Sequence, residues 1–342
     1  RYTPTAMEIP ELSLPLPWVA TAACVLFGLL VLPGAVSWIQ RAYERRQARK
    51  DPRITVTDIV VYPVKSCAGT AVTRHAVTRT GLQFDREWMV VDATGNFMSQ
   101  RVAPRMALIQ PQLPAKRGDD LVLTAPGMEP LRVPVRRGWF VPRVRVTVWS
   151  TPYRGVDQGD VAAKWLSSFL QRDGLRLVRF PDGYIRETDP EFAKGYRTAY
   201  SDGFPLLVAS EESLGELNRR MGKSKPDIPM NRFRPNVVLK GGGPFCEDNW
   251  TKIHCGDLSM LIVKPCTRCK IPTTDQATAE VSEEPTATLK KFRAGKDLGP
   301  GFEKSSWADE VFFGQNAVTT SSGVIAVGDE VRVVKMKPWA AW

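Results

Sequence analysis

The chain has 342 residues, enough for two ordinary domains, and its 43% hydrophobic and 24% charged residues are typical of a folded globular protein rather than a disordered one. Its 47 basic and 36 acidic residues give a net charge of +11, which suits an anionic membrane, an acidic protein, a nucleic acid or a phosphorylated cofactor. Six cysteines are too few for a disulfide scaffold and favour a reducing compartment, and two histidines exclude most histidine-dependent hydrolase and metal schemes.

The N-terminal segment predicts a membrane anchor. No charged residue occurs from Leu12 to Gln40, and the apolar run over residues 18–39 is long enough to cross a bilayer. Tryptophans stand near both ends of this run, which is too long for a signal peptide. The stretch RAYERRQARK that follows has five basic residues and one acidic. We predict a tail over residues 1–17, a transmembrane helix over 18–40 and a basic linker over 41–52.

The next hundred residues predict mostly strands. Alternating side chains over Arg53–Lys65 indicate a strand that ends in the loop SCAGT, and Val144–Trp149 alternates in the same way. The stretch Arg86–Arg101 predicts two strands around the turn ATGN. The segment Asp160–Gln171 predicts an amphipathic helix that opens on a capping aspartate.

The C-terminal part repeats this pattern with helices inserted. A helix is expected after the cap Ser210, and a strand over Leu258–Pro265 leads into the sequence CTRC. A short helix is expected at PTATLKKFRA, and VIAVGDEVRVVK predicts a two-strand closing unit. The polar, turn-rich stretch between about 175 and 198 predicts domains over 53–180 and 195–342. The expected fold class is therefore β-rich α+β with barrel-like sheets.

The sequence CTRC, with Cys266 and Cys269, leaves several chemistries open. A thioredoxin-like CxxC would open a helix after the first strand of a βαβ unit, but this one follows a late strand. Structural zinc would have to recruit Cys246 and Cys255, whose spacing is unusual for a zinc knuckle. A single thiolate favoured by the neighbouring Arg268 suits a soft or high-valent metal, and the nearby cations would attract a phosphate-bearing cofactor.

Six motifs in order resemble the MOSC-domain proteins, and among these the mitochondrial amidoxime-reducing components, which are molybdenum enzymes. The motifs are YPVKSC (62–67), FDREW (84–88), AYSDGFPLLVASEESL (199–214), FRPN (233–236), PCTRCKIPTTDQATAEVSEEPTATLKKFR (265–293) and FFGQ (312–315). Each motif alone is weak, whereas six in sequence are specific. The resemblance runs from about residue 53 to the C-terminus and includes the single N-terminal anchor.

The resemblance implies an N-terminal MOSC β-barrel-like region, a C-terminal MOSC β-barrel domain, and a molybdenum cofactor (Mo-molybdopterin) in the cleft between them. It implies that Cys269 is the molybdenum ligand and catalytic residue and that Cys266 is structural. Two positions depart from the animal relatives, which have a hydroxyl residue at 203 and a tyrosine at 316. The residues implied to hold the pterin and its phosphate are Lys65, Ser66, Arg86, Asp202, Gly203, Arg234, Asn236, Thr267, Arg268 and Asn316, beside Cys269 itself.

The implied function is reduction of small N-hydroxylated compounds such as amidoximes and hydroxylamines. In the relatives, electrons come from NADH through a flavin reductase and an acidic cytochrome b, which the basic balance here would help to dock. The implied location is a mitochondrial membrane crossed once, either outer or inner.

Two other functions stay open from the sequence. The chain is alternatively an accessory subunit of a larger mitochondrial membrane complex, with or without the cofactor, or a MOSC module that handles sulfur or transfers cofactor. Nucleic acid is not an expected partner, because the sequence has no basic sheet motif with interleaved aromatic residues.

Overall fold

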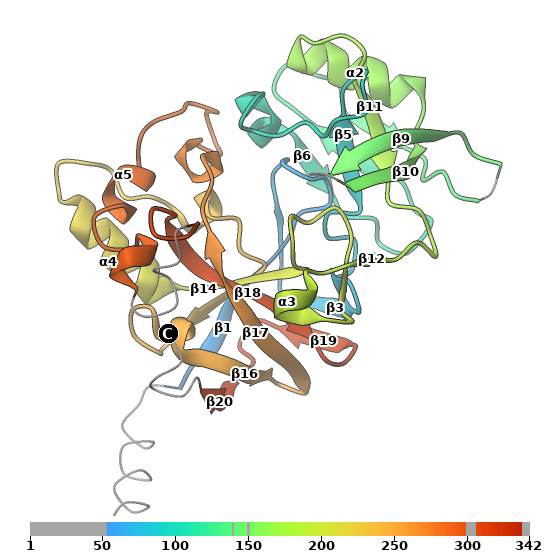
Figure 1. Cartoon of the computed structure of the whole chain (residues 1–342). Helices are drawn as coiled ribbons and strands as arrows, with labels where there is room; N and C mark the ends of the chain where they lie inside the picture. The colour runs from blue at the N-terminus through green and yellow to red at the C-terminus, as the bar shows by residue number, and fades with distance from the viewer. Residues whose placement is uncertain (1–52, 139, 149–150, 299–305, 337–342) are drawn as a thin grey trace, which may run out of the picture. The chain divides into compact units, whose positions relative to one another are not determined.

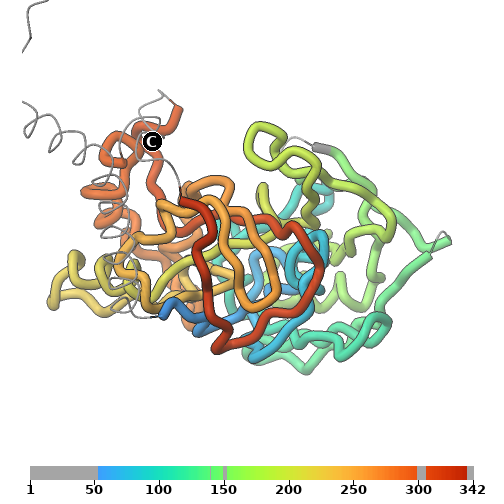
Figure 2. Tube along the Cα trace, turned by 90° about the horizontal axis from the view of Figure 1, so that it is seen from below, coloured from blue at the N-terminus to red at the C-terminus, as the bar shows by residue number. Residues whose placement is uncertain are grey.

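The largest sheet joins strands from both ends of the body. The computed structural model describes residues 53–138, 140–148, 151–298 and 306–336; the segment predicted to cross the membrane lies outside them. Eight strands pair in the order β2 (Thr70–Val72), β1 (Thr55–Val61), β15 (Val237–Lys240), β14 (Leu206–Ser210), β18 (Phe312–Thr319), β17 (Leu258–Thr267), β16 (Trp250–Cys255) and β20 (Val331–Met336). Figure 2 shows N-terminal segments beside C-terminal ones.

Backbone hydrogen bonds close this sheet into a barrel. One edge of β1 pairs with β15. The other edge bonds β2 and also residues 328–331, where β20 begins. The amide of Val56 donates to the carbonyl of Asp329 (3.0 Å), and the amide of Val331 donates to the carbonyl of Ile54 (2.8 Å). Closure leaves the barrel strands few unpaired backbone groups at a free edge. The expected C-terminal barrel is therefore present, but it needs β1 from the other end of the body.

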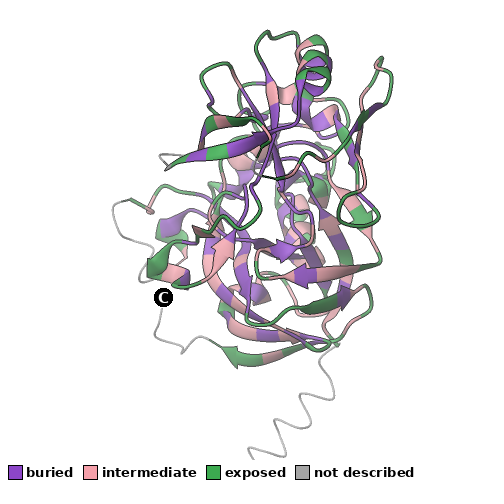
Figure 3. Cartoon of the chain, turned by 90° about the vertical axis from the view of Figure 1, so that its right-hand side faces the viewer, coloured by how far each residue is buried: buried purple, intermediate pink, exposed green. Residues whose placement is uncertain are grey.

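The barrel interior is filled by alternating apolar side chains. Ile59, Val208, Leu239 and Ile253, from four different strands, are buried in one cluster. Figure 3 shows the resulting change between buried and exposed positions along the strands. Because side chains alternate between the two faces of a strand, this pattern fixes the register of each pair.

A second group of elements packs separately along the chain between residues 86 and 180 (Figure 1). The helix α2 (Asp160–Leu170) places Trp165 and Phe169 against buried residues of the neighbouring strands. Its N-cap is Gly159 with no side-chain cap bond, so the predicted capping role of Asp160 is wrong; Asp160 lies in the first turn. The strands form a four-stranded sheet of β5 (Trp88–Val91), β11 (Arg176–Arg179), β10 (Thr151–Asp157) and β9 (Arg143–Val148), and a three-stranded sheet of β6 (Gln110–Gln112), β7 (Leu121–Thr124) and β8 (Leu131–Val133).

The remaining elements are short. The strands β19 (Gly323–Ala326), β3 (Arg74–Thr78) and β4 (Gly81–Leu82) form one sheet, and β12 (Arg186–Glu187) pairs with β13 (Arg197–Thr198). The helices are α3 (Pro190–Ala193), α4 (Glu211–Met221) and α5 (Thr286–Leu289), with short 3₁₀ turns over Pro104–Leu108, Met230–Arg232, Cys246–Asn249, Ile271–Thr273 and Gly295–Asp297. Within the described ranges, no helix has the length and apolar character needed to cross a membrane.

One strand predicted from the sequence is absent. After β5 and its turn, the residues near Phe97 make only isolated bridges, so the stretch 86–101 contains one strand and not two. The strands β19 and β20 both form, but β19 pairs with β3 and β20 pairs with β16. Barrel closure decides this, because the turn between them bonds β1 and directs the two strands into different sheets.

A buried carboxylate anchors the start of α4 to the barrel. Ser210 caps this helix as predicted, since its hydroxyl accepts from the amide of Ser213 (3.2 Å). The hydroxyls of Ser210 and Ser213 also donate to the carboxylate of Glu247, at 3.0 Å and 2.8 Å respectively. Glu247 is fully buried, and burial, with repulsion by Asp248, raises its pKa to about 7.

This raised pKa predicts a pH-dependent stability. The folded chain holds the Glu247 proton more tightly than the unfolded chain, so stability should fall as pH rises from the ordinary glutamate value to about 7. In Glu247→Gln, the melting temperature should therefore drop less than in wild type between about pH 5 and about pH 8. Glu216→Gln is the control, because hydrogen bonds from Arg219 and Arg220 lower the pKa of Glu216 to about 2 and keep it charged throughout. Equal melting shifts in wild type and Glu247→Gln would contradict the assignment.

Candidate active site

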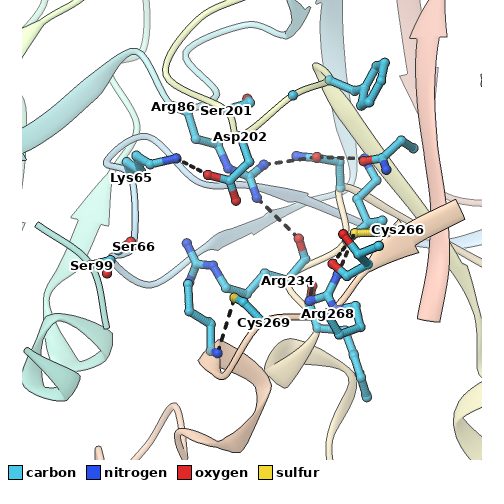
Figure 4. Close-up of a pocket in the computed structure, with 18 of the residues that line it drawn as sticks. Lys65, Ser66, Arg86, Ser99, Ser201, Asp202, Arg234, Cys266, Arg268 and Cys269 are labelled. Carbon is cyan, nitrogen blue, oxygen red and sulfur yellow. Dashed lines mark hydrogen bonds and ion pairs between the residues drawn. The ribbon is translucent and has the colours of Figure 1, made fainter. Parts of the chain in front are cut away.

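All eleven residues assigned from the sequence line one pocket of about 450 Å³. Figure 4 shows part of this pocket, with Lys65, Arg234 and Cys269 among the labelled residues. They come from loops that follow β1, β4 and β13, from the segment before β15, and from the end of β17 and the adjoining β18. Of the acidic residues, only Asp202 and Glu310 line it within the described chain, against six lysines and arginines. The pocket is therefore strongly cationic and suits an anionic ligand.

Three pocket residues have an unusual backbone. Ser66, Arg86 and Arg234 have φ angles of 66°, 46° and 58°, in the left-handed region that non-glycine residues rarely adopt. Such conformations cost about 1–3 kcal/mol each and persist where the surroundings impose them. Here the amide of Arg86 donates to the carbonyl of Tyr62 (2.7 Å), and the carbonyl of Arg86 accepts from the amide of Tyr200 (3.0 Å). Backbone strain thus collects around the pocket.

Asp85 holds the Arg86 side chain in place. Its carboxylate is buried and accepts from Nη1 of Arg86 (2.7 Å), the amide of Tyr62 (2.8 Å) and Nδ2 of Asn236 (2.9 Å). Arg86 also donates to Oδ1 of Asn236 (3.0 Å). In this structure, Asn236 therefore orients Arg86 and binds the strand β1, with its own Nδ2 donating to the carbonyl of Val60 (3.1 Å).

Lys65 and Asp202 form an ion pair on another wall. The Lys65 ammonium lies 2.5 Å from the Asp202 carboxylate and donates to the carbonyl of Tyr200 (2.9 Å). Burial lowers the pKa of Lys65, although Asp202 counteracts this. Desolvation by the pocket walls raises the pKa of Asp202, but Lys65 outweighs it and lowers the value to about 2. Asp202 is therefore ionised near neutral pH, and it is the more exposed partner of the pair.

Arg234 is buried with unused hydrogen-bonding capacity. Its guanidinium lies 4.3 Å from the ring centre of Tyr62, and Arg86 contacts the same ring at 4.3 Å. Its Nη2 has no hydrogen-bond partner among the described residues. Burial, together with repulsion by Arg86, lowers the pKa of Arg234 to about 10, so it remains charged at neutral pH. A buried cation with an unbonded donor favours an anionic ligand, because leaving that donor unsatisfied is costly.

The two CTRC cysteines differ in their surroundings. Cys269 is exposed at the pocket, and its sulfur accepts only a 3.5 Å contact from the amide of Ile271. The Cys266 sulfur accepts from Nη1 of Arg268 at 3.0 Å. Arg268 also donates to the carbonyl of Phe233 (2.8 Å). Cys269 is therefore the more accessible thiol, while Cys266 fixes Arg268.

The described cysteines do not support the zinc alternative. Cys255 is buried in the barrel interior, in the cluster that holds Ile253. Within the ranges that the structure describes, no three residues among His, Cys, Asp and Glu gather as a metal-binding group.

Sequence reasoning missed several pocket residues, some of them outside any motif and others inside a motif but with no role implied by the resemblance. Arg101 and Phe97 were assigned to a strand. Arg186, which lies outside the pocket lining, was assigned to a polar boundary segment. The Arg186 guanidinium donates to the carbonyls of Ser201 (2.5 Å) and Asp202 (2.7 Å) and so shapes the loop that presents Asp202. The other missed lining residues are Ser99, Ser201, Phe204, Leu206, Leu207, Phe233, Lys264, Cys266, Ile271 and Glu310.

Two buried glutamines clasp the pocket from opposite parts of the chain. Nε2 of Gln100 donates to Oε1 of Gln276, and Nε2 of Gln276 donates to Oε1 of Gln100, both at 2.9 Å. Gln100 also donates to the carbonyl of Ser66 (2.9 Å), and Arg234 contacts Oε1 of Gln276 at 3.4 Å. The two glutamines thus connect Ser66 and Arg234, two of the three pocket residues with a left-handed backbone.

The pocket chemistry fits a molybdenum–molybdopterin cofactor. The phosphate of this group needs positively charged donors, and Arg234 supplies a buried one whose Nη2 is unbonded within the described chain. The metal prefers a soft ligand, and Cys269 presents an accessible sulfur on the same pocket.

Family models match both halves of the described body. The MOSC N-terminal beta barrel domain matches residues 53–173, and the MOSC domain matches residues 195–332. This chain belongs to the MOSC-domain family. The pocket of this MOSC protein draws Lys65 and Arg86 from the first matched range and Arg234 and Cys269 from the second.

Similar curated proteins cover most of this MOSC chain. Mitochondrial amidoxime-reducing component 1 is 34% identical both in Mus musculus, over 92% of this chain and 91% of its own length, and in Homo sapiens, over 92% of each. Mitochondrial amidoxime reducing component 2 of Homo sapiens is 31% identical over 96% of this chain and 98% of its own.

The glutamine clasp predicts a coupled loss of stability. Gln100→Leu leaves the Gln276 amide buried without its partner, which should lower the free energy of unfolding by about 1–3 kcal/mol, and Gln276→Leu should do the same. The double variant should lose less than the sum of the two single losses, because no amide is left unsatisfied at that contact. Denaturant unfolding of the four proteins measures this coupling. Strictly additive losses would show that the two amides do not interact.

Proposed function

We propose that this chain is a molybdenum-cofactor-dependent reductase of N-hydroxylated compounds. The observation that carries the proposal is the cationic pocket in which Arg234 has an unbonded buried donor and Cys269 an accessible sulfur. Extensive similarity to proteins named for amidoxime reduction supports the same activity. The fold alone would not support this activity, because one fold can host many functions.

Each part of the pocket wall has a role in this proposal. Lys65, Arg86, Arg234 and Arg268 hold the pterin phosphate, for which arginine offers a planar two-donor fork. Ser66 and Thr267 add hydroxyl groups, and Asp202 keeps Lys65 oriented. Cys269 is the metal ligand. The cofactor, when bound, supplies the two-electron redox chemistry at its metal.

The overall reaction is a two-electron cleavage of an N–O bond. An amidoxime takes up two electrons and two protons and its N–O bond breaks. The nitrogen gains one proton to give an amidine, and the hydroxyl gains the other and leaves as water. The chain binds and orients the substrate beside Cys269. Its apolar lining residues Phe204, Leu206 and Leu207 exclude water from one side of the pocket.

The electron donor and the location of the chain are part of the same proposal. A cytochrome b with its NADH-dependent flavin reductase supplies the electrons, and the net charge of +11 suits an acidic donor. The relatives are named as mitochondrial components, and we place this chain on a mitochondrial membrane through its predicted N-terminal helix.

Replacement of Cys269 tests the proposal. Cys269→Ser should lose most bound molybdenum, measured by mass spectrometry, and should reduce benzamidoxime with dithionite more than about 100-fold more slowly than wild type, because a metal ligand is lost. Cys246→Ser is the control, because Cys246 lies outside the pocket and should keep both properties.

Three other results would change the assignment. Loss of metal in Cys266→Ser but not in Cys269→Ser would reverse the roles of the two cysteines. Molybdenum without turnover in wild type would favour the accessory subunit. Wild type without molybdenum from a cofactor-competent host would refute the cofactor.

A further inference from the structure

Lys264 is a pocket cation that the proposed phosphate site does not use. It lies on β17 two residues before Cys266, and irregular register on both sides of residues 264–265 turns this end of the strand toward the pocket. Its cross-strand partner Asn316 also lines the pocket. Lys264 therefore lines the same cavity as the two cysteines, but comes from a different element than Lys65 and Arg234.

Aromatic rings fix the position of this ammonium. Nζ of Lys264 lies 4.3 Å from the ring centre of Phe192 and 4.9 Å from that of Trp307. The two rings are themselves stacked, with centres 5.8 Å apart and planes at 25°. Phe192 lies on α3 and also packs against Phe204 (6.4 Å), another lining residue. The long lysine side chain is thus held in one place before any ligand arrives.

No described group neutralises this charge. Lys264 makes no hydrogen bond or ion pair with any residue in the described part of the chain, and Glu310, on the same pocket, is beyond salt-bridge distance. Lys65 pairs with Asp202, and Arg86 pairs with Asp85. Aromatic faces orient a cation and stabilise it weakly, but they leave its hydrogen-bond donors free for an anionic acceptor.

We propose that Lys264 is a substrate-recognition residue that makes the pocket selective for N-hydroxylated compounds carrying a carboxylate. The substrate identity rests on the function proposed above. The Phe192 and Trp307 rings hold the Lys264 side chain from outside the pocket lining. The Lys264 ammonium donates to the carboxylate of the bound substrate. The strand places this contact near Cys266, so the carboxylate end of the substrate and its N–O end bind in one pocket.

The test compares two substrates that differ by one charge, benzamidoxime and 4-carboxybenzamidoxime. Full-length, cofactor-loaded wild type, Lys264→Met and Lys264→Arg are assayed with dithionite, and their Kd values are measured by calorimetry without reductant. Lys264→Met should raise KM and Kd for the carboxylated compound about tenfold, because a charge-assisted hydrogen bond is lost, and leave those for benzamidoxime unchanged. Lys264→Arg should recover most of the loss. The control is Lys335→Met, which removes an exposed lysine of β20.

The outcomes separate this inference from the function on which it rests. Wild type that reduces neither compound refutes the reductase, while the Kd comparison still decides the role of Lys264. Equal changes for both compounds, or no change for either, overturn the inference. Loss of molybdenum from Lys264→Met also overturns it, because Lys264 would then hold the cofactor.

Discussion

The buried carboxylate of Asp85 ties three separate segments of the body to one pocket. It accepts hydrogen bonds from the Tyr62 amide, the Arg86 guanidinium and the Asn236 amide, which come from the loop after β1, the loop after β4 and the segment before β15. A buried charge is stable only when it is paired and hydrogen-bonded, so the three partners are held together. The barrel and the cation cluster are therefore built around the same contact.

This arrangement brings positive charges close together, although like charges repel each other. Arg86 and Arg234 contact the same tyrosine ring, and burial together with repulsion by Arg86 lowers the pKa of Arg234. The strained backbone at Ser66, Arg86 and Arg234 has a further cost. A bound anion would offset both costs, and active sites commonly store strain and like charge in this way.

Much of the site was predictable because its residues fall in short motifs with chemistry of their own. All eleven assigned residues line one pocket, although they are spread from Lys65 to Asn316. The Gln100 and Gln276 clasp and the Arg186 contacts were not predictable, because they join segments far apart in sequence by single hydrogen bonds. Asn236 was assigned to the cofactor from its motif, but its side chain bonds Arg86 and Asp85.

The sequence by itself determined several of the strands, where α2 and α4 begin and end to within a residue or two, and which motif side chains line the pocket. Local alternation, helix caps and motif chemistry need no distant partner, so they can be read along the chain. Only the tertiary structure decided strand partners. β1 closes a barrel with C-terminal strands, β19 and β20 enter different sheets, and Lys264 meets Phe192 and Trp307. The physical reason is that strand pairing and side-chain stacking depend on packing between segments separated by up to about 270 residues, which no local pattern encodes.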